Sequence, residues 1–254
     1  SFTTRQLMGH IAGIRHYRDD EEMLYRRASC TSPLDALVIY ADDPLLFEPA
    51  TAYEYSSYGW TLVGAVVEAA AGEPFLNFMQ REVFDPLGMG DTVLDDLHEP
   101  VATVGLLDSI EAHLLRRVGE PPVFDFEPKA HWDPARPGAE TTSFYWPFAA
   151  RDPTYGIEDA NNPDNTCLQG AAALLSTPSD VVRFGAAMLD GRLIRAGTLD
   201  MLRTPLELDS GESTGHGLGW FVQQIPIGPT AEPTTVFGHD GLSAGGSTSF
   251  VTVP

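Results

Sequence analysis

Residues 53–72 read YEYSSYGWTLVGAVVEAAAG and contain the clearest helix signal in the chain. From Ser57 to Ala71 the apolar positions are dense enough for a helix that is buried on most of its surface. Gly72 follows as the residue type that most often ends a helix, because glycine adopts the left-handed conformation without strain. The stretch therefore predicts one long buried helix.

The N-terminal end of this helix is crowded with hydroxyl groups. Tyr55, Ser56 and Ser57 precede or begin it, and a helix N-terminus favours anions because of its dipole and its unpaired N–H groups. Two interpretations stay open at this point. Ser56 or Ser57 simply caps the helix while Tyr55 fills space, or the phenol of Tyr55 ionises or transfers protons in a reactive site.

Helix signals also occur on both sides of this stretch. They are a Thr3/Gln6 capping box, the apolar spacing of residues 33–41, a helix that starts at Pro74, and a capping box at residues 177–180 whose helix stops at Gly191. We expect the helix after Pro74 to end before Pro86, because the residue preceding a proline disfavours the α conformation.

The last third of the chain changes to a period of two. Residues 217–224, 234–237 and 247–253 read as strands bounded by glycine and proline, which predicts an antiparallel sheet. Between the helices and these strands, residues 120–165 hold many prolines and aromatic rings. We expect a long irregular segment there, of the kind that often shapes a substrate mouth.

Composition excludes some function classes. The 254 residues are 43% hydrophobic and 20% charged, which is typical of a globular chain. Thirty-six acidic and fifteen basic residues leave a net charge of −21, which repels nucleic acid and anionic membranes. No apolar run approaches the length of a membrane span. We therefore expect neither a nucleic-acid partner nor a membrane span in this chain.

Cysteine and histidine spacing predicts neither a metal site nor a bound cofactor. The seven histidines form no H-E-x-x-H or paired Cys/His pattern, so most of them are expected to be surface or packing residues. Cys30 and Cys167 could form a disulfide or stay reduced, and their spacing does not decide between the two states. We expect free thiols.

One pattern match suggests a nucleophile. Residues 241–245 read GLSAG and fit the G-x-S-x-G elbow, which needs a strand before Ser243 and a helix after it. A glycine-rich turn and a β-type run follow instead, so a loop entering an edge strand is the favoured interpretation. An α/β-hydrolase using Ser243 would require a helix after residue 245. Ser1 is treated as an accidental terminal serine.

The segment Gly238-His239-Asp240-Gly241-Leu242 ends a predicted strand with a histidine between glycines. Glycine lets a ligand approach the backbone closely, which suits a binding site. The alternative for His239 is an edge histidine that is satisfied by its own surroundings.

Several segments together resemble the serine β-lactamase-like family, which includes class C β-lactamases, DD-peptidases, family VIII esterases and animal mitochondrial relatives. Residues 4–14 resemble its T-x-R-x-L-L-x-H-x-S-G stretch, and residues 86–92 resemble its PLGM-x-x-T stretch. Residues 14–17, 43–47 and 55–59 look most similar to the mitochondrial-type subgroup. The resemblance runs nearly from end to end.

This resemblance implies a mixed α/β fold with an antiparallel sheet, flanking helices and a mostly helical lobe. The helical lobe would span about residues 14–165 and the sheet lobe about residues 166–254, with the active site between them. We expect one incomplete domain that is truncated at both ends. The location stays open, with the bacterial periplasm or secretion favoured.

The resemblance also implies site residues on the helical side. Tyr55 corresponds to the tyrosine of the family's Y-x-N motif, which relays a proton between nucleophile and leaving group. Ser57 stands where asparagine is usual, so a carbonyl-orienting amide is lost. The family's nucleophile lies in an upstream S-x-x-K motif that is absent here, since the only lysine is Lys129 and Phe126 stands three positions before it.

On the sheet side, His239-Asp240-Gly241 resembles the H-x-G variant of the family's K-T-G motif. This implies that His239 lies beside Tyr55 as an electrostatic and hydrogen-bonding partner. Leu242 would offer its backbone N–H to the oxyanion. Because lysine would hold a substrate carboxylate more firmly than His239 does, lactam antibiotics are less favoured as substrates.

These implications predict a serine hydrolase or acyltransferase that acts on ester, amide or peptide bonds of a small molecule or peptide. The reaction would pass through an acyl-enzyme whose serine lies outside this chain. This fragment alone should then be inactive. The alternative is a non-catalytic binding or scaffold protein that kept the fold.

Overall fold

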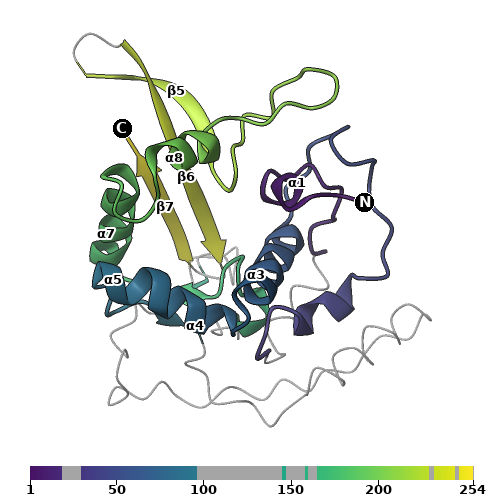
Figure 1. Ribbon diagram of the computed structural model, residues 1–254, viewed down its shortest axis with the longest axis horizontal. Coiled ribbons are helices and arrows are strands. Elements are labelled where there is room, and N and C mark those ends of the chain that lie inside the picture. The colour runs from purple at the N-terminus through teal and green to yellow at the C-terminus, as the bar shows by residue number, and fades with distance from the viewer. Residues whose placement is uncertain are drawn as a thin grey trace.

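The computed structural model describes residues 1–18, 30–95, 145–146, 158–159, 165–228, 232–243 and 246–253. Helices flank a three-stranded antiparallel sheet (Figure 1). This mixed α/β architecture is the fold class that the sequence predicted.

Helix α3 (Ser57–Ala71) is the long buried helix expected from residues 53–72. It begins where the Ser56 hydroxyl accepts the N–H of Gly59 at 2.9 Å, and it ends at Gly72 with a left-handed φ of 70°. The Tyr58 side chain is fully buried. Burial of one face and a cap at each end together define this helix.

Two short helices precede α3 in the chain. Helix α1 (Thr4–Met8) starts with the reciprocal Thr3/Gln6 capping box that its sequence predicted, and its Leu7 packs against Val63 of α3. The helical spacing of residues 33–41 corresponds to the 3₁₀ helix η1 (Asp35–Ile39) rather than to an α-helix.

The helix that follows Pro74 does not stop before Pro86, so that expectation is wrong. Helix α4 (Phe75–Met79) continues through a π-helical turn η2 (Gln80–Phe84) into α5 (Asp85–Leu87). The π turn starts a new helical segment, and Pro86 lies in its first turn. Proline is tolerated in a first turn because its missing N–H would have no partner there.

No single helix among the described residues is long and apolar enough to cross a membrane. Residues 57–71 and 75–87 taken together have the length and apolar composition of a membrane span, but the two helical segments are bent by 76° relative to each other.

The main sheet has the order β5 (Phe221–Ile227), β6 (Glu232–Ser243) and β7 (Gly246–Thr252), with all pairs antiparallel. The expected strands are therefore present with shifted bounds. Helices α7 (Pro178–Leu189) and α8 (Ala196–Leu202) lie beside this sheet (Figure 1). Met188, Leu199 and Phe237 join the two helices and β6 in one buried cluster.

Shorter elements complete the described fold. Strand β1 (Val93–Leu94) pairs with β4 (Leu174–Leu175), and β2 (Tyr145–Trp146) pairs with β3 (Glu158–Asp159). The 3₁₀ helix η4 (Thr166–Leu168) precedes β4. Apart from β2 and β3, the proline-rich segment 120–164 lies outside the described residues.

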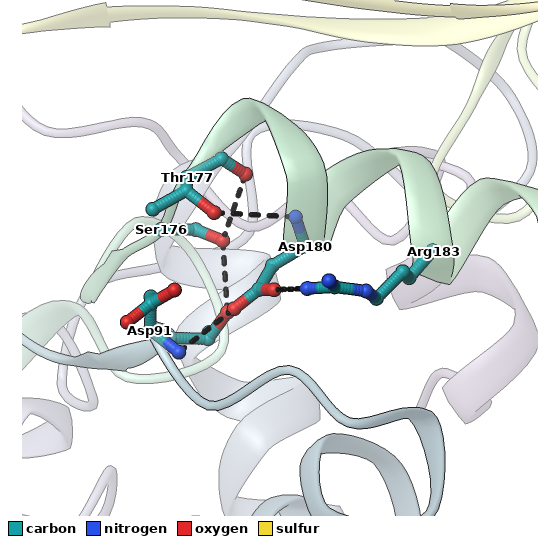
Figure 2. Close-up of polar contacts among 6 residues, drawn as sticks. Asp91, Ser176, Thr177, Asp180 and Arg183 are labelled. Carbon is teal, nitrogen blue, oxygen red and sulfur yellow. Dashed lines mark hydrogen bonds and ion pairs between the residues drawn. The ribbon is translucent and has the colours of Figure 1, made fainter.

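The start of α7 is joined to the turn before β1 by the carboxylate of Asp180 (Figure 2). Thr177 accepts the N–H of Asp180, as its sequence predicted. The Asp180 side chain does not complete the capping box. It is fully buried, accepts the N–H of Asp91 at 2.9 Å and the Thr92 hydroxyl at 3.0 Å, and forms an ion pair with Arg183. Its carboxylate therefore connects two elements.

Cys30 and Cys167 form a disulfide, so the expectation of free thiols is wrong. Both residues are buried, and the N–H of Cys30 donates to the Thr166 hydroxyl at 2.9 Å. The two cysteines belong to a buried cluster that includes Tyr40 and, from α3, Tyr58. A separation of 137 positions carries no information on such a contact, because only the folded chain brings the two segments together.

Candidate active site

Tyr55 and His239 meet at the point where the helical and sheet elements adjoin. Tyr55 directly precedes the N-cap of α3, and His239 lies in β6. The phenol oxygen Oη is 3.4 Å from the imidazole Nε2, and the ring centroids are 6.1 Å apart. The expected convergence of these two side chains, 184 positions apart, is therefore observed.

The phenol of Tyr55 is partly buried, with 37% of the residue exposed. Burial raises its pKa above the ordinary value of 10.0, and a hydrogen bond with Ser57 partly opposes this rise. The phenol therefore carries its proton at neutral pH. A protonated hydroxyl beside an imidazole can both donate and accept a proton, which is what a relay requires.

The other predicted site residues, Ser57, Gly241 and Leu242, lie within three positions of Tyr55 or His239 in the sequence. Ser57 is the first residue of α3, two positions after Tyr55. Gly241 lies in β6 opposite Thr248, and a side-chain carbon there would come within 2.5 Å of the Thr248 hydroxyl. A side chain at position 241 would therefore displace the Thr248 hydroxyl next to the site. Leu242 follows with 87% of the residue exposed, so no part of the core covers it.

The GLSAG match is part of a hairpin. Strand β6 runs through Ser243, and β7 starts at Gly246 and pairs with it. A nucleophile elbow needs a helix after the serine, whereas residues 246–252 form a strand. The α/β-hydrolase alternative that depended on Ser243 is therefore wrong.

Two further histidines contact the Tyr55 ring, and a third lies against one of them, which local sequence did not predict. The His10 ring centroid lies 4.4 Å from that of Tyr55, and the His16 ring lies edge-on at 5.6 Å. His216 lies edge-on to His10 at 6.2 Å. His10 is the histidine of the stretch 4–14 that resembles the family, and the resemblance assigned it no role.

His10 and His16 also bind the backbone that follows Tyr55. Nδ1 of His10 accepts the N–H of Ser56, and Nδ1 of His16 accepts the N–H of Ser57, both at 3.1 Å. The first amides of α3 are therefore occupied. This end of the helix does not offer these two N–H groups to an anion, and Ser56 is the cap, as one of the two interpretations held.

The environment of His10 keeps its imidazole neutral. Burial, together with the nearby His216, His239 and His16, lowers the pKa of His10 to about 3. Burial also lowers the pKa of His216. A neutral His10 is what the hydrogen bond to Ser56 requires, because a protonated Nδ1 cannot accept.

A buried ion pair lies behind the site. Arg15 is 6% exposed, its Nε donates to Asp43 at 2.6 Å, and its guanidinium lies over the Tyr58 ring at 5.0 Å. The Ser56 hydroxyl donates to the Arg15 carbonyl at 2.7 Å. Arg15 therefore packs beneath the start of α3. Within the described part of the chain, no group of three or more His, Cys, Asp or Glu residues could hold a metal ion.

Comparisons with known proteins show the family of the chain. The Beta-lactamase family model matches residues 1–254. The human mitochondrial serine beta-lactamase-like protein LACTB is 38% identical over 78 residues, which cover 31% of this chain and 14% of that protein. Penicillin-binding protein 4* of Bacillus subtilis is 22% identical over 256 residues, which cover 98% of this chain and 48% of that protein. The chain thus spans at most about half the length of these relatives.

A solved structure of a D-stereospecific amidohydrolase from Streptomyces sp. superposes with a TM-score of 0.68. It is 18% identical and covers 99% of this chain and 64% of that one. At this level of identity the likeness shows the fold.

Proposed function

The chain belongs to the Beta-lactamase family, and from this premise we propose that it is part of a serine hydrolase or acyltransferase. Its substrates would be ester, amide or peptide bonds of small molecules or peptides, cleaved through an acyl-enzyme. The approach of Tyr55 Oη to His239 Nε2 at 3.4 Å carries the proposal.

In the proposed acylation, the serine hydroxyl of an S-x-x-K segment outside these 254 residues attacks the substrate carbonyl. The serine gives its proton to the Tyr55 oxygen as the phenol gives its own proton to the leaving group, so Tyr55 ends unchanged. The raised pKa of Tyr55 supports this role, because the phenol starts protonated. His239 orients the phenol hydroxyl through Nε2.

The oxyanion would be held by backbone donors beside β6. In the proposed arrangement Leu242 supplies one N–H and the serine supplies the other, and losing one such donor costs about a hundredfold to a thousandfold in rate. The exposure of Leu242 supports this role, because a substrate can approach its backbone without displacing the core. The 254-residue chain alone, with one donor and no nucleophile, is expected to be inactive.

The charges near the site favour neutral or amine-bearing substrates over anionic ones. Glu54 directly precedes Tyr55, and Asp240 directly follows His239. Both carboxylates are exposed, and the net charge of the chain is −21. An imidazole at position 239 holds a carboxylate less firmly than a lysine would. The amide substrate class in the name of the Streptomyces neighbour is consistent with this choice.

The test compares the 254-residue chain with the full-length reading frame. Each is incubated with an activated ester and with a serine-directed fluorophosphonate probe. We expect turnover and labelling from the full-length protein and from it alone. Turnover by the 254-residue chain that Tyr55→Phe abolishes would refute the assignment of the nucleophile. A full-length protein that neither turns over nor is labelled would support the non-catalytic scaffold instead.

A further inference from the structure

In addition to the Ser56 cap, helix α3 begins with two backbone amides that donate to histidines. Helix N-termini are normally satisfied by a Ser, Thr, Asp or Asn side chain or by water. Here the amides of Ser56 and Ser57 each donate to the Nδ1 of a histidine, from His10 and His16 respectively. These histidines lie 46 and 41 positions earlier in the chain, so one segment holds the start of α3 at two successive amides.

The same two imidazoles also pack against the Tyr55 ring. The His10 ring is tilted by 33° at a centroid distance of 4.4 Å, and the His16 ring stands at 68° and 5.6 Å. Each histidine therefore contacts the phenol ring and also binds a backbone amide that follows it. With its ring in contact with both histidines, Tyr55 has its phenol oxygen 3.4 Å from Nε2 of His239.

His10 adopts a backbone conformation that non-glycine residues seldom use. Its φ is +59°, which places it in the left-handed region. Its carbonyl accepts the N–H of Glu54 at 3.0 Å, and the next residue, Ile11, accepts the N–H of Ala50, which also has a positive φ of 71°. Such residues persist where the surroundings hold them, and they cluster at functional sites.

We propose that His10 and His16 are positioning residues for Tyr55. Acting as neutral Nδ1 acceptors, they set the backbone direction and the ring position that aim the phenol at His239. They act through Tyr55 and do not contact substrate, and the inference rests on the proposed function of Tyr55. The proton of each neutral ring is then on Nε2, the nitrogen that does not accept the amide.

The variants His10→Asn and His10→Leu separate the hydrogen bond from packing. Asparagine tolerates a positive φ and can present Oδ1 in place of Nδ1, whereas leucine fills the volume and accepts nothing. His16→Asn and His16→Leu form a second pair at a position that is less buried, so the comparison survives if His10→Leu does not fold.

The first measurement needs no catalytic activity. Tyrosine ¹³Cζ NMR, with Tyr55→Phe as the assignment control, follows the titration of the Tyr55 phenol in the full chain. We expect the wild-type ¹³Cζ signal and titration in both asparagine variants. In the leucine variants we expect a shifted ¹³Cζ signal, because losing the Nδ1 acceptor displaces the phenol, whereas burial keeps its pKa raised. Histidine ¹⁵N NMR at neutral pH should show unprotonated Nδ1 atoms at His10 and His16.

The second measurement uses turnover by the full-length protein. The leucine variants should lower kcat about tenfold to a hundredfold while KM changes little, and the asparagine variants should keep most of the rate. A Tyr55 ¹³Cζ signal that is the same in all variants, or protonated Nδ1 atoms, would overturn the positioning role. If the wild type has no turnover, the proposed function fails, and the NMR results still decide whether the two histidines position Tyr55.

Discussion

At the scale of single residues, two side chains at the centre of the site are held in their neutral form. The phenol of Tyr55 is protonated because burial raises its pKa, and burial and neighbouring imidazoles keep His10 uncharged. A proton relay benefits from such an environment, because no permanent charge fixes the proton on one partner. Two kinds of measurement address individual residues.

Replacing Tyr55 by phenylalanine removes only the hydroxyl. In the full-length protein we expect turnover of an activated ester to fall about a hundredfold to ten-thousandfold, because the relay group is lost. The melting temperature should change little, since the residue is 37% exposed. Tyr53→Phe is the matched control two positions earlier, and equal losses from both variants would argue against a special role for Tyr55.

The neutral state of His10 makes stability depend on pH in acid. Its pKa is about 3 in the folded chain and 6.5 when unperturbed, so the unfolded state binds the proton more tightly. The stabilisation is complete above pH 6.5 and is lost as the pH falls toward 3. The loss between pH 6.5 and pH 4 should be on the order of 3 kcal/mol.

Denaturant unfolding of the wild type and of His10→Asn across this range isolates the effect of His10. The asparagine variant has no group to titrate at that position, so the difference in unfolding free energy between the two proteins should shrink or reverse as the pH falls. Parallel curves for the two proteins would show that His10 is not held neutral.

At the scale of elements, polar side chains join segments that local sequence does not connect. Asp180 starts within a helix signal but binds the turn that precedes β1 (Figure 2). Its carboxylate is fully buried, so each hydrogen bond that it accepts replaces water that cannot reach it. The link holds α7 against the β1–β4 pair.

Substituting Asp180 by alanine leaves the Asp91 N–H and the Thr92 hydroxyl without this acceptor. We expect a loss of about 2–4 kcal/mol in the free energy of unfolding, because two hydrogen-bonding groups lose a buried charged partner. Asp180→Asn should lose less, since it keeps one acceptor. Asp190→Ala is the control, because its ion pair with Arg192 is exposed and such pairs contribute about 0–1 kcal/mol. Equal losses at positions 180 and 190 would contradict this account.

At the scale of the whole molecule, the Cys30–Cys167 disulfide connects the segment before η1 to η4. It lies in the buried cluster that contains Tyr40 and the α3 residue Tyr58. The bond therefore supports the helix whose N-terminus carries Tyr55, although it lies outside the site itself.

A Cys30→Ser/Cys167→Ser double variant should unfold more easily by about 2–5 kcal/mol, because the cross-link closes a long loop. Thermal unfolding with and without a reductant checks this expectation. Reductant should lower the melting temperature of the wild type and leave that of the variant unchanged. A wild type that is insensitive to a reductant under unfolding conditions would mean that the bond does not form in solution.

Local signals determined much of this protein from its sequence. The length and caps of α3, the Thr3/Gln6 box, the start of α7 and the antiparallel strands all follow from residues a few positions apart, where propensity and periodicity act directly. The path of the chain through Pro86 could not be predicted in this way, because no local signal marks the π turn that precedes it.

The tertiary structure alone decided which distant groups meet. Motif resemblance suggested that Tyr55 and His239 converge, but the histidine caps on Ser56 and Ser57 and the disulfide appeared only in the folded chain. These contacts join residues 41 to 184 positions apart. Local preferences set the conformation of each segment but carry no information on its distant neighbours, which the burial of shared surfaces selects.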